Sequence, residues 1–435
     1  MSKPIKIVII GGTACGPKAA ARARRCDPAA RITLVEQGSG ISTATCGFPY
    51  YISSVIQERS DLIVRGPEYF KNVMDIDVLL GTRAQRIRPS EHTVEVVYLQ
   101  TRKVETLPYD RLVLATGSSP LVPPLESKEL QGIFTLSKLE DADNIKQYMA
   151  HHDVRRVAVI GAGFIGLEMA EAFHKMGAEV HIIEALDHAM PAFLDLEMSA
   201  QLEKHLRSKG IKLYFGAGVT GFAGDGEGAV NRVILEKSTL EIQMVLLSVG
   251  TRPNVVLARE AGLAIGERGG IAVNQFMQTG DQDIYAGGDC VENLHRITGK
   301  KVLAALGSTA NKHGRVIGSN ITGGRETFPG VLGTGIAKVF DLSVGRTGLI
   351  EQGAVAEGYE VFSSLVNGSE HAGYYPGSRD FLLKLVVNKA DNRVLGAQLL
   401  GEGDVSKRLD VLVTAISLGA TVDDLSHLDL AYAPP

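Results

Sequence analysis

The sequence has few cysteines, no long apolar segment and no excess of charge of either sign. Its four cysteines, Cys15, Cys26, Cys46 and Cys290, form no C-x-x-C pair, so neither a zinc ribbon nor a thioredoxin-type dithiol is expected. Sparse cysteine in a long chain is typical of a reducing compartment, and we predict a cytoplasmic protein. No segment approaches 18 apolar residues or resembles a signal peptide, so we expect no membrane span.

The charges nearly balance, with 45 basic and 49 acidic residues and a net charge of −4. This balance argues against a nucleic acid partner bound along the whole chain, although a local basic patch is still compatible with it. A length of 435 residues allows about three domains. Glycine is abundant, at 49 residues or about 11%, against a usual value of about 7%.

Two segments about 150 residues apart follow one pattern of strand, glycine corner, helix and second strand ending in glutamate. The glycines and the glutamate are Gly11, Gly12, Gly16 and Glu36 in the first segment and Gly161, Gly163, Gly166 and Glu184 in the second. Glycine lets a pyrophosphate approach the backbone, and the helix N-terminus offers free N–H groups. The glutamate can accept hydrogen bonds from a ribose diol. The pattern predicts two dinucleotide-binding units, although Thr13 replaces the middle glycine of the first.

Further strands end at a glycine or an acid over residues 109–117, 244–250 and 284–289, and a proline-rich linker covers 120–124. From about residue 331 the pattern changes. The final segment contains strand-like runs at 381–388 and 393–400 and a helical run at 406–418, without a glycine fingerprint. It is therefore predicted to form a separate α+β domain and is a candidate dimer surface.

With these motifs, the whole chain resembles the pyridine nucleotide–disulfide oxidoreductase superfamily of flavoproteins. The resemblance implies an α/β fold with two Rossmann-like domains, the second inserted in the first, and a C-terminal α+β dimerisation domain that makes a homodimer. The implied domains are 1–118 with 249–328 for FAD, 119–248 for NAD(P)H and 329–435 for dimerisation.

The resemblance also implies the cofactor ligands. FAD would contact Gly11, Gly12, Gly16, Glu36, Ala115, Thr116, Gly117, Asp289 and Thr309. The nicotinamide dinucleotide would contact Gly161, Gly163, Gly166, Glu168, Glu184 and Gly250, with Glu168 near the nicotinamide. A carboxylate at Glu184 would repel a 2′-phosphate, so NADH is preferred to NADPH. No metal is expected.

The segment 42–51, Ser-Thr-Ala-Thr-Cys-Gly-Phe-Pro-Tyr-Tyr, carries Cys46 at an expected helix start, with Pro49 in the first turn. A helix N-terminus favours the reactive thiolate, whereas out of context such a cysteine is more often a small buried apolar residue. Family members with a redox disulfide carry C-x-x-x-x-C here. The single cysteine therefore resembles the branch of coenzyme A-disulfide reductases, persulfide and polysulfide reductases, and NADH oxidases and peroxidases.

Two features depart from the patterns of that branch. Thr43 and Thr45 replace residues of its Ser-Phe-x-Asn-Cys motif, and Ala14 stands where peroxidases have histidine, which disfavours peroxidase activity. Cys15, Cys26 and Cys290 are interpreted as incidental. Cys15, at a helix N-terminus, is the one whose thiol could itself be perturbed.

Substrate-binding residues are predicted on the first helix and near the chain end. Lys18, Arg22 and Arg25 recur at helical spacing and could clamp coenzyme A phosphates, although a solvated basic face has the same pattern. Ser42 is assigned to the same site. Tyr375 and Tyr432 resemble tyrosines that approach the partner subunit's cysteine, with Tyr432 favoured as the acid for the leaving thiolate. The alternative for both is packing in a dimer interface.

Together these features predict a homodimeric enzyme that passes electrons from NADH through FAD to Cys46. The Cys46 thiolate would attack a coenzyme A disulfide, persulfide or polysulfide and form a mixed disulfide. The alternatives are an NADH oxidase that works through a cysteine sulfenic acid, an electron-transfer flavoprotein or redox sensor, and a non-catalytic dinucleotide-binding scaffold. Family members usually continue past the position of Pro435, some into a rhodanese domain.

Overall fold

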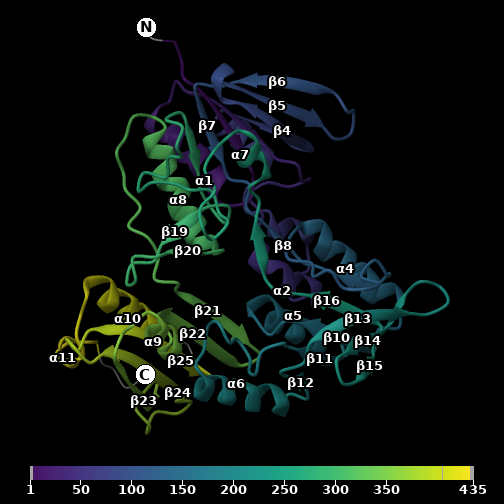
Figure 1. The fold of residues 1–435 in the computed structure, drawn as a ribbon, viewed down its shortest axis with the longest axis vertical. Helices are drawn as coiled ribbons and strands as arrows, with labels where there is room; N and C mark the ends of the chain where they lie inside the picture. Colours follow the sequence, from purple (N-terminus) through teal and green to yellow (C-terminus); the bar gives the residue numbers. More distant parts are fainter. Residues whose placement is uncertain (1–2, 404, 432–435) are drawn as a thin grey trace.

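The computed structural model describes residues 3–403 and 405–431 and contains three units (Figure 1). The first unit is built on a parallel sheet of five strands in the order β18–β7–β1–β2–β3. These strands are β1 (Lys6–Ile10), β2 (Arg31–Val35), β3 (Ile76–Leu79), β7 (Arg111–Leu114) and β18 (Ile284–Ala286). Because β1, β2 and β7 are almost entirely apolar and buried, they suit a sheet covered on both faces.

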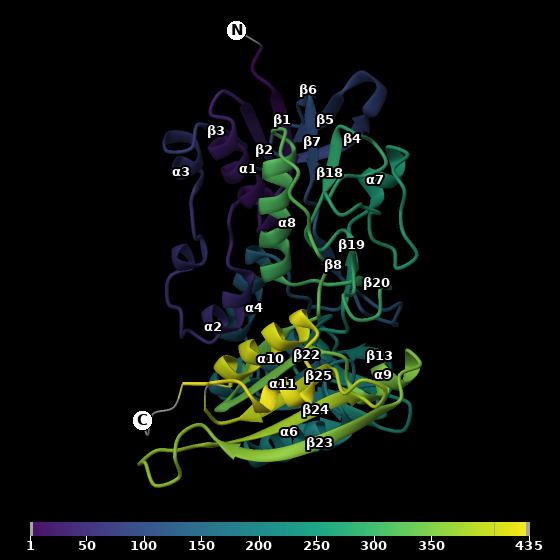
Figure 2. The same cartoon turned by 90° about the vertical axis from the view of Figure 1, so that its left-hand side faces the viewer.

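Helices α1 (Cys15–Cys26) and α8 (Gly307–Asn320) pack side by side against this sheet (Figure 2). Glycines on α8 allow the close contact. A Cβ on Gly314 or Gly318 would lie 2.5 Å from a backbone oxygen of α1, so a larger residue at either position would push the helices apart. A three-stranded antiparallel sheet completes the unit, formed by β4 (Thr82–Arg88), β5 (Thr93–Tyr98) and β6 (Val104–Pro108).

The second unit repeats the parallel arrangement in the order β12–β11–β10–β16–β9. Its strands are β9 (Ile133–Phe134), β10 (Arg156–Ile160), β11 (Glu179–Ile183), β12 (Lys212–Tyr214) and β16 (Met244–Leu247), and its helices are α4 (Leu139–His151), α5 (Phe164–Lys175) and α6 (Leu196–Ser208). A small antiparallel sheet of β13 (Val219–Gly224), β14 (Val230–Leu235) and β15 (Thr239–Glu241) lies beside them. The repeat confirms the prediction of two Rossmann-like units.

The chain leaves and re-enters the first unit through two paired strands. β8 (Ser118–Pro120) and β17 (Thr251–Pro253) pair antiparallel, and the second unit lies between them in sequence. This pairing explains how one nucleotide-binding unit is inserted into another without separating β7 from β18. The domain boundaries derived from the sequence remain predictions.

The C-terminal unit has an antiparallel sheet in the order β21–β22–β25–β24–β23. Its elements are β21 (Gly335–Val339), β22 (Leu342–Gly348), α9 (Glu351–Ala356), β23 (Val361–Ser369), β24 (Asp380–Asn388), β25 (Val394–Gly401), α10 (Ser406–Leu418) and α11 (Val422–Ser426). The expected strands at 381–388 and 393–400 and the helix at 406–418 are confirmed. The remaining short elements are α2 (Phe48–Ile52), α3 (Pro67–Asn72), α7 (Val256–Glu260), β19 (Glu292–Leu294) and β20 (Lys301–Leu303), with 3-10 turns at Thr45–Gly47, Arg59–Leu62 and Pro89–Glu91.

One apolar core joins all three units. Phe48 and Ile52 of α2 pack in the same buried cluster as Leu167 of α5 and Val339 of β21. Helix α2 therefore belongs to the first unit by sequence and to the core of the second by packing. Among the described helices, none is long and apolar enough to cross a membrane.

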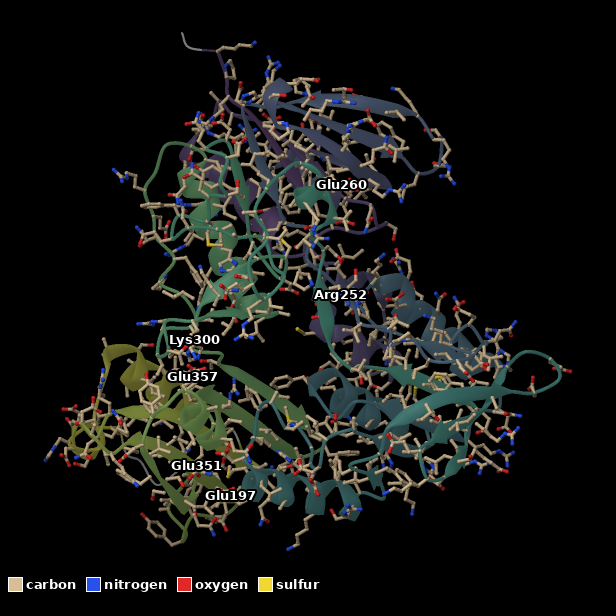
Figure 3. The ribbon with its side chains drawn as sticks, viewed as in Figure 1. Glu197, Arg252, Glu260, Lys300, Glu351 and Glu357 are labelled. Atoms are coloured by element: carbon tan, nitrogen blue, oxygen red, sulfur yellow. The ribbon has the colours of Figure 1, made fainter. Side chains whose placement is uncertain are left out.

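A buried ammonium group holds the second unit to the C-terminal unit. Lys384 of β24 is 1% exposed, and its Nζ lies 2.9 Å from Asp195 Oδ2, 2.6 Å from Glu351 Oε2 and in contact with Glu197 Oε1. Burial alone would lower the pKa of Lys384, but the three carboxylates outweigh burial and raise it. Gln398 donates to Asp195 as well. Glu197 and Glu351 lie together where α6 meets α9 (Figure 3).

We expect Lys384→Met to lower the free energy of unfolding by about 3–5 kcal/mol, because it leaves buried carboxylates without their cation. Chemical denaturation followed by circular dichroism measures the change. Lys389→Met, at an exposed position of the same unit, is the matched control and should leave stability unchanged. Equal stability of the two variants would show that the buried cluster contributes nothing to the joint.

Candidate active site

The two glycine corners have the same backbone geometry. Gly11 and Gly161 have positive φ angles of 111° and 104°, and their N–H groups donate to the last carbonyl of the neighbouring strand, at 2.9 and 2.8 Å. A Cβ on Gly16 would lie 1.9 Å from Gly11 O, and one on Gly166 would lie 2.1 Å from Gly161 O. Glycine is therefore required at both positions, since the helix must start against the strand end.

Each corner carries a carboxylate at the end of its second strand. Gly12 N–H donates to Glu36 Oε2 at 2.6 Å, and Ala162 N–H donates to Glu184 Oε2 at 2.9 Å. A second backbone N–H, two residues beyond each glutamate, donates to its other oxygen. Both acids are thus held beside a helix N-terminus, in the position from which a carboxylate can accept from a ribose.

The helix starts at these corners fit the phosphates of dinucleotides. Ala14 and Gly163 precede α1 and α5, and neither side chain has an atom that could cap the first backbone N–H groups. A Cβ on Gly163 would meet no described atom within 4 Å, so the backbone is open to a ligand there. The geometry therefore suits an FAD at the first corner and a nicotinamide dinucleotide at the second.

The other predicted FAD residues gather near the first corner. Ala115 N–H donates to Ile10 O at the end of β1, and Gly117 follows with a φ of +66°. Ser118 donates to Asp289 Oδ2 at 3.2 Å, and burial raises the pKa of Asp289. Gly250, at the matching strand end of the second unit, has a φ of +111°.

Helix α8 and a residue that the sequence analysis missed complete this side of the site. Thr309 is buried in the first turn of α8, which follows a leucine that cannot cap it. Asn254 exchanges hydrogen bonds with Thr116, accepting on its backbone oxygen at 2.7 Å and donating from its side chain at 2.9 Å. Its place just after the Gly250 corner was the only sequence signal for it.

His313 of α8 was also missed. It is fully buried, and Gly288 N–H donates to its Nδ1 at 3.1 Å. Burial lowers the pKa of His313 to about 3, so the ring is neutral and carries its proton on Nε2. That atom has no partner among the described residues. A single histidine in a helix has no sequence pattern that reveals this environment.

Burial disfavours the thiolate form of the two buried cysteines, Cys15 and Cys290, by raising the pKa of each thiol. Burial, followed by the nearby Cys290 and Asp289, raises the pKa of Cys15. Its thiol is therefore perturbed, but toward the neutral form. Burial likewise raises the pKa of Cys290, whose thiol donates to Gly287 O at 3.3 Å. Cys26 is exposed at the end of α1.

Cys46 is exposed and lies in the 3-10 turn that leads into α2. The helix itself begins two residues later, at Phe48, with Pro49 in its first turn. Ser42 N–H donates to Gly12 O at 2.7 Å, and Ser42 has a φ of +55°. This bond ties the cysteine segment to the first glycine corner, so Cys46 is carried on the first unit.

A second anchor ties α2 to the second unit. Tyr51 donates to Asp143 Oδ1 of α4 at 3.0 Å, and Arg59 forms an ion pair with the same carboxylate at 2.8 Å. Lys146 Nζ donates to Tyr51 O and lies 4.1 Å from the centre of its ring. These contacts place α2, the helix that follows Cys46, between the two nucleotide-binding units. The sequence analysis did not predict them.

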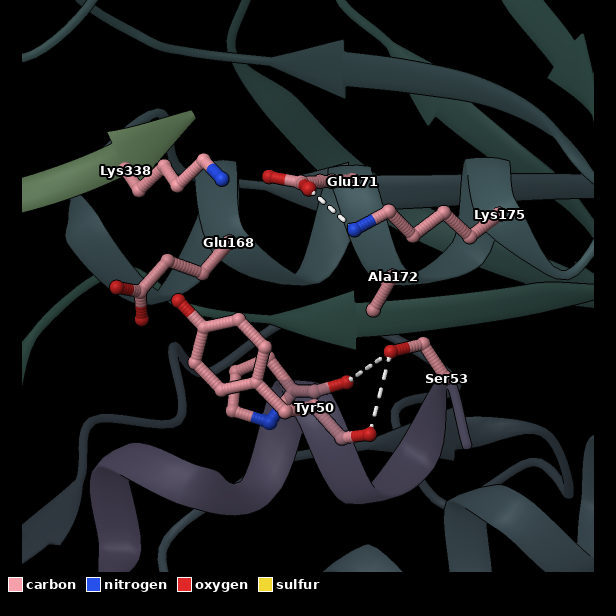
Figure 4. Close-up of a pocket in the computed structure, with 8 residues that line it drawn as sticks. Tyr50, Ser53, Glu168, Glu171, Ala172, Lys175 and Lys338 are labelled. Carbon is pink, nitrogen blue, oxygen red and sulfur yellow. Dashed lines mark hydrogen bonds and ion pairs between the residues drawn. The ribbon is translucent and has the colours of Figure 1, made fainter. Parts of the chain in front are cut away.

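Glu168 of α5 faces α2 across a small pocket (Figure 4). Burial and the neighbouring Glu171 raise the pKa of Glu168 to about 7. Ionisable groups with such shifts are common at functional sites.

The predicted substrate residues differ in their exposure and in the contacts they make. Arg22 Nε donates to Ser319 Oγ of α8 at 2.8 Å, and Lys18 is half-buried at the same helix contact, whereas Arg25 is exposed. Tyr375 is exposed in the connection between β23 and β24, and Tyr432 lies outside the described residues.

In the part of the chain that the structure describes, no group of histidine, cysteine and acidic residues could hold a metal.

Comparison with known proteins identifies this architecture. Residues 5–314 match the pyridine nucleotide-disulphide oxidoreductase family, and residues 335–435 match the dimerisation domain of that family. The chain belongs to this family. It is therefore an FAD-dependent oxidoreductase that uses a nicotinamide dinucleotide, and its dimerisation domain supports a homodimer.

Individual relatives show which members of this family the chain is similar to. The chain is 37% identical over 433 residues to the NAD(P)H coenzyme A polysulfide/persulfide reductase of Pyrococcus horikoshii, covering 99% of this chain and 95% of that protein. It is 34% identical over 431 residues to an NADH oxidase of Methanocaldococcus jannaschii, with the same coverage. The structure of an NAD-dependent persulfide reductase from A. fulgidus superposes with a TM-score of 0.96 at 45% identity, covering 99% of this chain and 80% of the other.

We expect Gly166→Ala to raise the dissociation constant for NADH at least about tenfold, or about 1.4 kcal/mol, because its Cβ would collide with Gly161 O. Titration of NADH into the purified protein measures the constant, and the visible flavin spectrum should be retained. Gly226→Ala is the control, since a Cβ there would meet no described atom within 4 Å. Unchanged NADH affinity in Gly166→Ala would argue against the second corner as the NADH site.

Proposed function

We propose that this enzyme reduces a coenzyme A disulfide, a persulfide or a polysulfide with electrons from NADH, through FAD and Cys46. The observation that carries the proposal is the exposed Cys46, whose segment is tied to the first glycine corner by the bond from Ser42 to Gly12. The next cysteine in the sequence is Cys290, so no neighbouring thiol could form a redox disulfide within this segment. Such a single cysteine suits formation of a mixed disulfide with an external sulfur compound.

Different residues of the chain would hold the two cofactors. The first corner, with Glu36, Asp289 and the start of α8, would hold FAD, and the second corner with Glu184 would hold NADH. When bound, FAD relays an electron pair between the nicotinamide and Cys46. The carboxylate of Glu184 disfavours a 2′-phosphate, which supports NADH as the preferred donor.

The proposed sulfur chemistry takes place at Cys46. Its thiolate attacks one sulfur of the substrate, a Cys46–sulfur bond forms, and the substrate's sulfur–sulfur bond breaks. The leaving thiolate takes up a proton, and Tyr432 or Tyr375 of the partner subunit is the proposed donor. Two electrons that originate from NADH then cleave the mixed disulfide, which restores the Cys46 thiolate and releases the second product as a thiolate that takes up a proton from solvent.

The homodimer gives the tyrosines their proposed role. Strand β23 lies at the edge of its sheet, with Phe362, Leu365 and Val366 between 41% and 51% exposed. An exposed apolar edge strand is a common contact between subunits. Tyr375 follows this strand, so we propose that dimer formation brings the tyrosines toward the cysteine of the other subunit.

An NADH oxidase is the second candidate, favoured by the similarity to the Methanocaldococcus enzyme. In that case Cys46 would cycle through a sulfenic acid, with oxygen as the acceptor. Both candidates use the same cysteine, and they differ in whether NADH is consumed rapidly in air without an added sulfur compound.

We expect Cys46→Ser to reduce turnover of coenzyme A disulfide and persulfide at least about a thousandfold, because the nucleophile is lost. Steady-state assays without oxygen measure the loss, and NADH should still bleach the flavin. Cys26→Ser, which alters the other exposed cysteine, should keep full activity. Full turnover by Cys46→Ser would refute the mechanism.

We expect the double variant Lys18→Ala/Arg25→Ala to raise the KM for coenzyme A disulfide roughly a hundredfold, since each of the two lost hydrogen bonds to a phosphate contributes about 1.5 kcal/mol. The KM for inorganic polysulfide, which has no phosphate, should not change. Arg31→Ala, at an exposed position at the start of β2, is the control. An equal effect on both substrates would argue against coenzyme A binding along α1.

A further inference from the structure

One row of residues across the C-terminal sheet faces residues 190–195, the segment that precedes α6 and that we call the linking segment. Gly335 of β21 pairs with Arg346 of β22. Arg346 pairs in turn with Gln398 of β25, which pairs with Lys384 of β24. Because residues directly opposite each other on neighbouring strands point to the same face of a sheet, these four residues share one surface.

The three polar members of the row all bond to the linking segment. Arg346 Nη1 donates to Ala192 O at 2.8 Å. The Asp195 N–H donates to Gln398 Oε1 at 2.7 Å, and Gln398 Nε2 donates back to Asp195 Oδ2 at 2.6 Å. Lys384 Nζ lies 2.9 Å from the same carboxylate oxygen. Strands β22, β25 and β24 of the C-terminal unit therefore hold this segment of the second unit together.

The other side of the linking segment contacts the second glycine corner. The Met190 N–H donates to Ala162 O at 3.0 Å, and the Ala162 N–H donates to Glu184. The ring of Phe193 packs edge-on against the ring of Phe164, with 4.5 Å between the ring centres. Phe164 is the first residue of α5. The linking segment thus supports the helix start that follows the corner.

The same row encloses the two aromatic rings. Arg346 Cζ lies 4.8 Å from the centre of the Phe193 ring, and Phe193 is only 8% exposed. A Cβ on Gly335 would lie 3.0 Å from Phe164 Cζ and 3.2 Å from Phe193 Cε2, so both rings press against the backbone of β21. Burial lowers the pKa of Arg346 to about 10. The guanidinium therefore stays charged at neutral pH and attracts the face of the ring.

We propose that Arg346 and Phe193 are positioning residues for NADH, through which the C-terminal unit holds the start of α5 in the form that binds the dinucleotide. Arg346 fixes the linking segment and the Phe193 ring, and this ring supports Phe164. The first N–H groups of α5 then stay directed at the place of the phosphates. Without this support, binding must order the segment again, which lowers the affinity. The inference rests on the proposed assignment of NADH to the second corner.

Calorimetric titration of NAD⁺ into the oxidised, FAD-bound enzyme tests the inference without any turnover. We expect Arg346→Met to raise the dissociation constant roughly threefold to tenfold, the effect of one side chain that must be ordered on binding. Arg346→Lys keeps a cation near the ring, so its increase should be smaller. Arg393→Met, which alters an exposed arginine of the same unit, is the matched control and should bind NAD⁺ as the parent does.

Phe193→Leu tests the ring without a change of charge and keeps the position apolar. It should also weaken NAD⁺ binding roughly threefold or more. In steady-state assays the KM for NADH should rise in Arg346→Met and Phe193→Leu. The kcat at saturating NADH, the KM for the sulfur substrate and the FAD content should stay close to those of the parent, because neither residue contacts Cys46 or the first corner.

Unchanged NAD⁺ affinity in both Arg346→Met and Phe193→Leu would overturn the inference. Loss of FAD and of kcat in both variants would overturn it as well, because that result indicates a structural role alone. Gly166→Ala distinguishes either result from a failure of the proposed function. If Gly166→Ala weakens NAD⁺ binding and the other two variants do not, the second corner binds the dinucleotide without support from the C-terminal unit.

Discussion

The close approach of backbone to backbone at the two glycine corners is the constraint on which the rest of the structure depends. A Cβ on Gly16 or Gly166 would lie about 2 Å from the carbonyl of the first glycine in its corner. Because that space is empty, each helix can begin against the end of its strand, with its first N–H groups beside the carboxylate of Glu36 or Glu184. The same contact orients α1, and α8 packs on α1 through glycines of its own.

The position of Cys46 depends on the first glycine corner and on contacts with the second unit. The segment that carries Cys46 is tied at one side to the first corner, through Ser42, and at the other side to α4 of the second unit, through Tyr51 and Asp143. The segment that carries Cys46 therefore lies where the two nucleotide-binding units meet, as the proposed transfer of electrons to its thiol requires. The apolar contacts of Phe48 and Ile52 in the core of the second unit hold this arrangement.

Ion pairs connect the units to one another, and these pairs differ in how deeply they are buried. Lys384 is buried with three carboxylates, whereas the ion pair of Lys300 with Glu357 links β20 to the end of α9 at an exposed site (Figure 3). Exposed pairs contribute little, so the buried group is the stronger connection. In the pocket at Glu168, by contrast, burial and the neighbouring Glu171 raise the pKa of a carboxyl group to about 7.

The sequence by itself determined the two nucleotide-binding units, the separate C-terminal domain and the cysteine that stands alone in its segment. These features depend on local patterns, namely glycines at fixed offsets, apolar strands and a glutamate at a strand end. The environments of His313, Tyr51 and Glu168 were decided only by tertiary structure. Their partners are separated in sequence by 25 residues for Gly288 and His313 and by 92 for Tyr51 and Asp143. Burial and neighbouring charge, which set the ionisation of His313 and Glu168, exist only once distant segments have packed together.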